Sequence, residues 1–343
     1  MNYIGVDPAA DSFTCSIFKD GKRIGKPKKI TSTDELGGKD ELGAKDELLH
    51  WITGAGCVRQ NTLICIENTG VYSEVLLYQL NRAAWPVVLI EPMKVHRAFE
   101  KDRPKTDEID SAMIAEYAWR YRDKLTLWTP HEAVVEQIKV LLTTREQIVK
   151  QQTALSNTRK ALTRKYIQTP TANSSVDALL EQIRLQIKEL EAEIKRLIKS
   201  HPTLASTVAM LITAPGVGML LAAHLLVITG GFTKELSYTQ LARHLGIAPL
   251  PYESGTSVKR KPKSRGKGPK TMRKLLHLAA RSMVTHKAKF KHYYARKLAE
   301  GKPAKLVLNN VSNQLLRIVC SMLKHNKPYI DGYVSVNPRI LLT

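Results

Sequence analysis

Tyr3-Ile4-Gly5-Val6-Asp7, close to the start of the chain, is an apolar run that ends in a carboxylate and is typical of a β-strand. Two further strand-like segments, residues 12–18 and 22–30, flank the dipeptide Asp20-Gly21. Asp-Gly readily adopts the two positive φ values of a type I′ turn, which joins antiparallel strands tightly. The first 30 residues therefore predict three antiparallel strands.

The elements that follow alternate between helix and strand. We expect a helix through residues 48–52, a strand over 62–66 that ends at Glu67, a helix over 73–82, a strand over 86–90, and helices near 93–100 and 106–120. Strand-strand-strand-helix-strand-helix-strand-helix is the order of the ribonuclease H-like fold. Residues 1–125 are accordingly predicted to form an α/β domain.

Four carboxylates occupy positions at which such a fold can bring them together. Asp7 and Glu67 end two strands, and Asp107 and Asp110 lie three residues apart at the start of a helix. Clustered carboxylates repel one another unless hard cations neutralise them, and oxygen ligands favour Mg²⁺ or Mn²⁺ over zinc. Each acid alone is more often a solvated turn or helix-start residue. Together they predict metal-assisted chemistry on phosphodiesters.

The net charge of the chain indicates a polyanionic partner. Its 343 residues carry a formal charge of +22, and phosphate neutralisation by Lys and Arg supplies most non-specific affinity for nucleic acids. No run of about 18 apolar residues is present, and the N-terminus lacks the basic and apolar regions of a secretion signal. We therefore expect a cytoplasmic nucleic-acid-binding protein, with binding to an anionic membrane as the weaker alternative.

The four cysteines do not form a recognisable pattern. Cys15, Cys57, Cys65 and Cys320 show no CxxC spacing. They are interpreted as reduced structural thiols, and neither a zinc site nor a disulfide framework is supported.

A hexapeptide repeat interrupts the N-terminal domain. Residues 34–39 and 40–45 are near copies, and residues 46–50 are a partial third copy. A six-residue period fits no helical face, and each glycine weakens a helix by about 1 kcal/mol. We expect a frayed or extended surface insertion without an assigned function.

The middle of the chain has a heptad-like pattern, and we expect it to form a coiled-coil helical hairpin over residues 126–205. The stronger seam comprises Val176, Leu180, Ile183, Ile187, Leu190, Ile194 and Leu197. A weaker seam comprises Val134, Ile138, Leu141, Ile148 and Leu155. Residues 168–175, rich in Pro, Asn and Ser, are predicted to break the helix and form the tip. The sequence leaves open whether the seam closes within one chain or between two chains.

Residues 206–343 are expected to form a mainly helical C-terminal domain. Pro215-Gly216-Val217-Gly218 precedes an apolar helix over 219–228 and resembles a helix-hairpin-helix turn. Backbone amides of Gly216 and Gly218 at such a helix start could hold a phosphate, although Pro-Gly turns also join helices without any ligand.

A basic segment follows that turn. No acid occurs from residue 254 to residue 299, which favours a bound polyanion over a solvated loop. The nucleic-acid-binding candidates in it are Lys259, Arg260, Lys261, Lys263, Arg265, Lys267, Lys270, Arg273 and Lys274. Ser254 stands at its edge, and cations or Mg²⁺ would favour the alkoxide of a serine. Serines before glycine are usually turn residues, and Ser257 and Ser264 are rivals in the same segment.

Taken together, these motifs resemble the DEDD transposases of bacterial insertion sequences, a family that includes the bridge-RNA-guided serine recombinases. The resemblance covers nearly the whole chain. Its marks are Asp7, the block Glu67-Asn68-Thr69-Gly70-Val71-Tyr72, the block Lys105-Thr106-Asp107-Glu108-Ile109-Asp110, and the C-terminal segment from Ala214 to Gly255. The repeat at residues 34–50 matches no part of the family pattern.

The resemblance implies roles for these residues. Asp7, Glu67, Asp107 and Asp110 would form the metal-binding tetrad of a RuvC-like catalytic domain, holding Mg²⁺ or Mn²⁺. Ser254 would attack DNA and form a covalent phosphoserine link that a second strand end resolves. The resemblance further implies a homo-oligomer, a dimer or tetramer, and a non-coding guide RNA that pairs with target and donor DNA.

Two alternatives stay open at this point. A junction-resolving nuclease of the same fold would use water as its nucleophile and leave free DNA ends. A non-enzymatic nucleic-acid-binding protein with a decayed acidic cleft would tolerate loss of Asp7.

Overall fold

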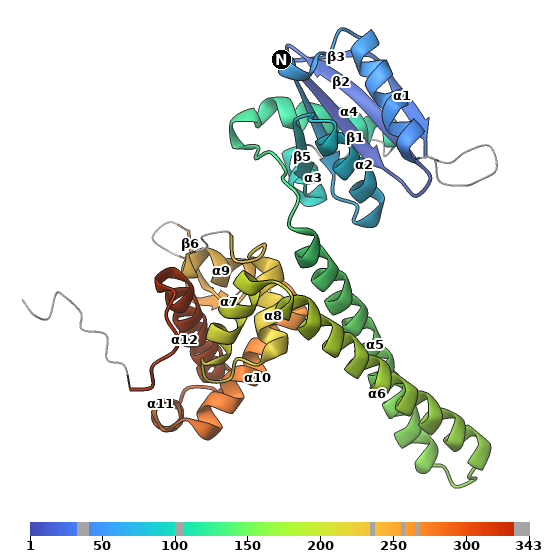
Figure 1. Cartoon of the computed structure of the whole chain (residues 1–343). Helices are drawn as coiled ribbons and strands as arrows, with labels where there is room; N and C mark the ends of the chain where they lie inside the picture. Colours follow the sequence, from blue (N-terminus) through green and yellow to red (C-terminus); the bar gives the residue numbers. More distant parts are fainter. Residues whose placement is uncertain (33–40, 100–105, 234–236, 255–257, 265–267, 333–343) are drawn as a thin grey trace, which may run out of the picture. The chain divides into compact units, whose positions relative to one another are not determined.

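The computed structural model describes residues 1–32, 41–99, 106–233, 237–254, 258–264 and 268–332, and in residues 41–42, 250–254 and 258–263 it describes the backbone alone. Contacts divide the chain into two compact units, Met1–Pro130 and His131–Thr343 (Figure 1). Each unit is described by itself. The domain boundaries expected near residues 125 and 205 stay predictions.

A five-stranded mixed sheet forms the centre of the first unit. Its strands are β1 (Asn2–Pro8), β2 (Ser12–Lys19), β3 (Lys22–Thr31), β4 (Thr62–Glu67) and β5 (Val87–Ile90), in the order β3-β2-β1-β4-β5. The β1–β2 and β2–β3 pairs are antiparallel, whereas β1–β4 and β4–β5 are parallel. The turn between β2 and β3 has φ values of 49° at Asp20 and 81° at Gly21, which confirms the predicted type I′ geometry.

Helices cover both faces of this sheet, as the fold prediction requires. Side chains of α1 (Glu41–Gly54) and α2 (Val71–Arg82) pack with alternate strand residues such as Ile4 and Ile64 on one face. Side chains of α3 (Pro92–Ala98) and α4 (Asp107–Arg120) pack with Tyr3 and Cys65 on the other. Short 3-10 helices cover Arg59–Asn61 and Arg122–Lys124. The element order and sheet topology confirm a ribonuclease H-like fold.

Helix α4 lies directly against β1 and runs antiparallel to it. A Cβ atom added to Gly5 would lie 2.1 Å from the Ser111 carbonyl oxygen, so the middle of the strand touches the middle of the helix. The Ser16 and Ser111 hydroxyls also share a 2.8 Å hydrogen bond. Near the other end of the helix, Trp119 packs on Phe18, which pairs with Tyr3 near the start of β1. Helix α4 therefore begins at the sheet edge where β1 ends.

Replacing Gly5 with alanine is expected to destabilise the first unit by about 3 kcal/mol, because the new methyl group would overlap the α4 backbone. Urea unfolding followed by tryptophan fluorescence measures this, since all four tryptophans lie before residue 131. Gly54→Ala is the matched control, because a Cβ at Gly54 has nothing within 4 Å. An equal unfolding midpoint for the two variants would contradict the packing account.

The prediction for the repeat is wrong over its second half. Residues 41–50 belong to helix α1, whereas residues 34–40 lie outside the described residues. Ala44, Leu48 and Ile52 are spaced four residues apart and fully buried against the sheet. This burial outweighs the helix penalty of Gly43, so tertiary packing decides the conformation.

The second unit begins with a long antiparallel hairpin of α5 (Ala133–Thr163) and α6 (Pro170–Lys199), as predicted. Every residue of the two predicted seams is buried or half-buried. The tip is shorter than expected. Pro170 occupies the first turn of α6, where its missing N–H costs nothing, so residues 170–175 extend the helix and do not break it.

The rest of this unit is mainly helical. It contains α7 (Pro202–Ile212), α8 (Met219–Ile228), α9 (Tyr238–His244), the antiparallel hairpin of β6 (Pro249–Ser254) and β7 (Val258–Ser264), α10 (Lys270–His286), α11 (Ala288–Ala299) and α12 (Ala304–His325). One hydrophobic core joins these helices to the adjoining ends of α5 and α6. Among the described residues, no helix is long and apolar enough to cross a membrane. The four cysteines are free thiols, as predicted.

Stability of this unit is expected to depend on pH through His224. Burial lowers the pKa of its imidazole to about 4, partly opposed by the Glu146 carboxylate. Between about pH 4 and the ordinary value of about 6.5, the unfolded chain binds a proton that the folded chain does not, so stability rises as pH rises through this window. The contribution is about 2 kcal/mol after allowance for the part of the ring that stays exposed.

Urea unfolding followed by circular dichroism between pH 4 and 7 tests this assignment. His224→Gln should flatten the rise in unfolding free energy, because glutamine does not titrate. The exposed His286 provides the matched variant, His286→Gln, which should keep the slope of the wild type. An unchanged slope in His224→Gln would refute the assignment.

Candidate functional site

Asp7 and Glu67 stand beside each other at one edge of the sheet. Strands β1 and β4 are parallel, and Val6 pairs with Ile66, so the residues that follow lie at the same level. Side chains alternate along a strand. Because Tyr3 and Cys65 face α3 and α4, Asp7 and Glu67 point to that same face.

Asp107 and Asp110 lie on the first turn of α4, which begins at this edge. The Thr106 hydroxyl caps the helix by accepting a 3.3 Å hydrogen bond from the Ile109 amide, and the acids of the first turn complement the helix dipole. Ile114 is buried against the sheet four residues after Asp110 and seven after Asp107, so both acids lie on the sheet-facing side of the helix. Sequence spacing and packing thus direct all four carboxylates to one edge and one face.

The carboxylates are not gathered around a single point. Within the described part of the chain, no group of three or more His, Cys, Asp or Glu side chains is close enough to bind one metal ion. The donor set is nevertheless all oxygen, and Asp7 and Asp110 are half-buried, which suits a hard divalent cation reached from solvent. The assignment of the four acids as a metal tetrad stays a prediction.

Exposed apolar side chains border the same edge, which the sequence did not single out by itself. Val71 is 71% exposed and Tyr72 is 52% exposed at the start of α2, just after Glu67. With Ala9 and Ala10, which follow Asp7, they line a cavity of about 260 Å³. Phe13 and Leu76 also line this cavity and belong to the α1–α2 face of the sheet, opposite the face of the acids. A large exposed aromatic at the ends of these strands could stack on a nucleic-acid base.

Ser254 is the last residue of β6, in the second unit. It pairs with Val258, and Pro249 pairs with Ser264 at the base of the hairpin. Lys259, Arg260, Lys261 and Lys263 belong to β7, while Lys270, Arg273 and Lys274 belong to α10. Ser257, Arg265 and Lys267 lie outside the described residues. Asp7 and Ser254 are therefore in different units, and their roles in one site remain predictions.

Two asparagines fix the chain just before the β6–β7 hairpin. The Asn309 and Asn313 side-chain amides each donate a 3.2 Å hydrogen bond to the Ile247 carbonyl oxygen. The Tyr238 hydroxyl donates to the Asn313 side-chain oxygen at 2.8 Å, and the Arg317 guanidinium lies 4.6 Å from the centre of the Tyr238 ring. Isolated asparagines on a helix gave no sequence signal for this contact.

Packing against α10 accounts for the glycine at position 216 in the Pro-Gly turn. Gly216 has φ of 78°, and a Cβ there would lie 2.7 Å from the Ala279 carbonyl oxygen of α10. The Val217 amide already donates to the Ala214 carbonyl oxygen at 3.1 Å. Gly218 precedes α8 in open space, so phosphate binding at Gly216 and Gly218 stays a prediction.

Comparisons with known proteins find similarity to transposases along most of the chain. A family model described as "Transposase", of the DEDD type of IS110, matches residues 4–167, and one described as "Transposase IS116/IS110/IS902 family" matches residues 208–295. The pilin gene-inverting proteins of Moraxella lacunata and Moraxella bovis are each 28% identical over 271 residues, 78% of this chain and 81% of theirs.

Two further matches are more limited. An uncharacterized 43.6 kDa protein of insertion element IS110 from Streptomyces coelicolor is 32% identical over 160 residues, 47% of this chain and 37% of its own. A solved structure of T. thermophilus RuvC in complex with a Holliday junction substrate is 15% identical to this chain, with a TM-score of 0.30. The match covers 37% of this chain and 99% of the RuvC chain. The ribonuclease H-like assignment rests on the strand order and pairing.

Proposed function

The chain belongs to the IS116/IS110/IS902 family of transposases, and from this premise we propose that it cuts and rejoins DNA strands with Ser254 as nucleophile and divalent cations held by Asp7, Glu67, Asp107 and Asp110. The observation that carries the proposal is the placement of the four carboxylates at one edge and on one face of the sheet. Carboxylates would repel one another in such an arrangement without a cation.

The proposed chemistry is two transesterifications. The Ser254 hydroxyl oxygen forms a bond to a backbone phosphorus while the bond from phosphorus to a deoxyribose oxygen breaks, the serine proton passes to a base, and the departing oxygen takes up a proton. A deoxyribose hydroxyl of another strand then attacks the phosphoserine and releases the serine. Each step exchanges one ester for another, so no high-energy cofactor is consumed.

The acids would contribute through the cation that they hold. Bound Mg²⁺ or Mn²⁺ would neutralise charge that develops on the phosphate. Glu67 and Asp7 are fixed by neighbouring strands, and Asp107 and Asp110 by a capped helix, so their carboxylates are held by regular structure. Tyr72 would stack on a base of the strand at this edge.

Partners are part of the proposal. Because the acids and Ser254 belong to different units, the acidic domain of one subunit could complete the serine site of another in a dimer or tetramer. A guide RNA that pairs with target and donor DNA would leave the protein to contact backbone and shape, which suits a charge of +22. Sequencing the RNA that copurifies with the protein tests this part.

A denaturing gel of end-labelled DNA incubated with the purified full chain and Mg²⁺ tests the reaction. A serine nucleophile predicts labelled DNA that migrates with the protein and is released by protease. Free cleaved ends without any protein-linked DNA would instead favour the water-using nuclease.

A further inference from the structure

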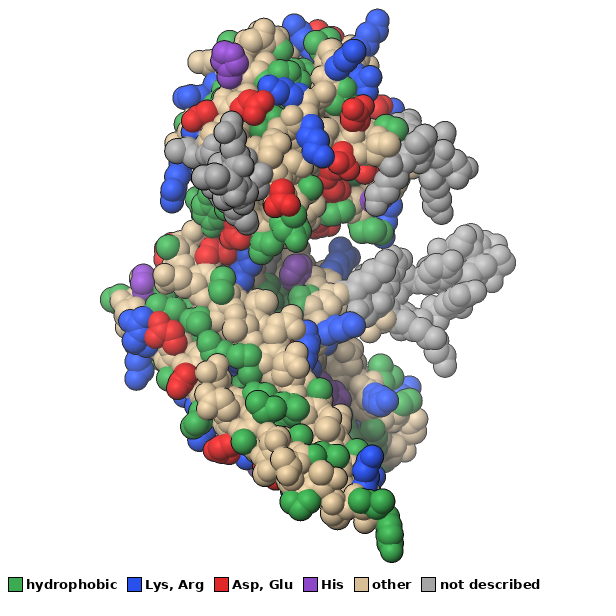
Figure 2. Space-filling view, turned by 90° about the vertical axis from the view of Figure 1, so that its right-hand side faces the viewer, with side chains coloured by type: hydrophobic (Ala, Val, Ile, Leu, Met, Phe, Trp, Pro, Cys, Tyr) green, Lys and Arg blue, Asp and Glu red, His purple; other side chains and the backbone are tan. Residues whose placement is uncertain are grey.

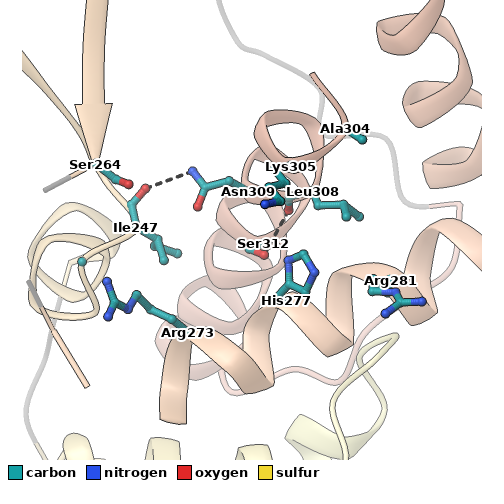
Figure 3. A pocket seen from close by; sticks show the side chains of 11 residues that line it. Ile247, Ser264, Arg273, His277, Arg281, Ala304, Lys305, Leu308, Asn309 and Ser312 are labelled. Carbon is teal, nitrogen blue, oxygen red and sulfur yellow. Dashed lines mark hydrogen bonds between the residues drawn. The ribbon is translucent and has the colours of Figure 1, made fainter. Parts of the chain in front are cut away.

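A basic cavity lies between α10 and α12 at the base of the β6–β7 hairpin. Its volume is about 430 Å³. Figure 2 shows Lys and Arg side chains spread over both units on one face of the molecule, so charge alone does not mark a site. This cavity does mark a candidate binding site, because it combines a concave shape with basic side chains from two facing helices (Figure 3).

Three basic side chains form a row on one helix. Arg273, His277 and Arg281 are spaced four residues apart on α10 and line the cavity side by side (Figure 3). Lys305 faces them from the first turn of α12. Among the side chains that the structure describes, no Asp or Glu lines the cavity, and none forms a salt bridge with His277, Arg281 or Lys305. The gathering of His277, Arg281 and Lys305 at one cavity favours an anionic ligand.

The shape of the row favours a strand over a single ion. Eight residues of α-helix rise about 12 Å, so the three α10 side chains extend over that length. One nucleic-acid strand carries a phosphate about every 3.4 Å along a duplex axis. A row of this length can therefore contact several phosphates in succession, whereas a single phosphate would occupy only one end.

The uncharged polar side chains of Ser312 and Asn309, which line the cavity, already form hydrogen bonds within the protein. The Ser312 hydroxyl donates to the Leu276 and Leu308 carbonyl oxygens at 3.2 and 3.0 Å, and the Asn309 amide donates to the Ile247 carbonyl oxygen. These bonds fix α12 against α10 and against the chain that enters β6. The helices that carry the basic side chains are thus held together by hydrogen bonds.

We propose that this cavity anchors the backbone of the DNA strand that Ser254 cuts, through phosphates away from the scissile one, with Arg281 and Lys305 as positioning residues. The inference rests on the proposed function. Ser264, which lines the cavity, pairs with Pro249 at the opposite end of the hairpin from Ser254. Five strand residues span about 17 Å, so the anchored phosphates would lie within about five nucleotides of the cut.

Salt-dependent binding tests the anchor. The full chain and the double variant R281Q/K305Q are titrated onto a fluorescein-labelled 30-nucleotide DNA strand, and the slope of log affinity against log salt is measured by anisotropy. Loss of two phosphate contacts should reduce the slope by about 1.4 and weaken binding about tenfold near 0.1 M salt. The matched double variant K291Q/K324Q removes two exposed charges outside the cavity and should keep the slope within about 0.3 of wild type.

Two results would overturn the anchor. One is an equal loss of slope in the two double variants; the other is a loss confined to an RNA strand of the same sequence. The adduct assay with wild-type protein is read separately. If wild-type protein forms adducts and R281Q/K305Q keeps the wild-type salt slope, the anchor is wrong and the proposed reaction is supported. If the slope of R281Q/K305Q falls and wild-type protein forms no adduct, the cavity binds phosphates but Ser254 is not the nucleophile.

Discussion

Replacing Ser254 with alanine is expected to abolish covalent protein–DNA adducts and to slow strand exchange by at least about 10³-fold. The variant lacks the oxygen that forms the phosphoserine bond, and loss of a nucleophile commonly removes almost all of the catalysed rate. DNA affinity should change less than twofold, since the substitution removes no charge. Labelled adducts on a denaturing gel and binding by anisotropy measure the two quantities on one preparation.

Ser257→Ala is the matched control, because Ser257 is a rival hydroxyl only three residues further along the chain. It should form adducts at a rate within about threefold of wild type. If Ser254→Ala still forms adducts and Ser257→Ala does not, the nucleophile assignment is wrong. If both variants form them, the ester belongs to another side chain.

Replacing Asp7 with asparagine is expected to lower the rate by at least about 10³-fold and to remove its dependence on Mg²⁺ concentration. Asparagine keeps the size of the side chain but removes the negative charge that would hold the cation. Because Asp7 is half-buried at the end of β1, the N-terminal unit should stay folded. Strand-exchange rate across a Mg²⁺ titration, with tryptophan fluorescence as the folding check, measures this.

Asp20→Asn provides the same chemical change at the opposite edge of the sheet. Asp20 has φ of 49° in the type I′ turn, where asparagine is equally well tolerated, so neither folding nor rate should change appreciably. Full strand-exchange activity in Asp7→Asn would refute the role of Asp7 in holding the cation, whereas DNA binding without strand exchange in both wild type and variant would support the non-enzymatic alternative. Equal losses in both variants would show that the effect is general to the domain.

The sequence was sufficient for the element order of the N-terminal sheet. Apolar runs that end at Asp7 and Glu67, together with the Asp20-Gly21 turn, predict strands because their signals are local. Local signals fail where packing opposes them. Gly43 lies inside α1 because its neighbours are buried, and Pro170 begins α6 where the sequence suggested a break.

The candidate site was predictable to a similar degree. Strand alternation and helix spacing direct the four acids to one face, as the structure shows for the elements that carry them. The Asn309 and Asn313 contacts with Ile247, and the opposition of Lys305 to the α10 row, depend on how distant helices pack. No local pattern marks such contacts. Whether Ser254 meets the acids depends on the arrangement of two units or two subunits.

The α5–α6 hairpin limits how the protein can assemble. The residues of its two seams are buried or half-buried, and the two helices contact each other within one chain. A second copy could therefore bind these seams only after α5 and α6 had separated. Their separation would expose the apolar surface that now holds the two helices together. A dimer or tetramer must therefore form through a different surface, unless α5 of one chain pairs with α6 of another.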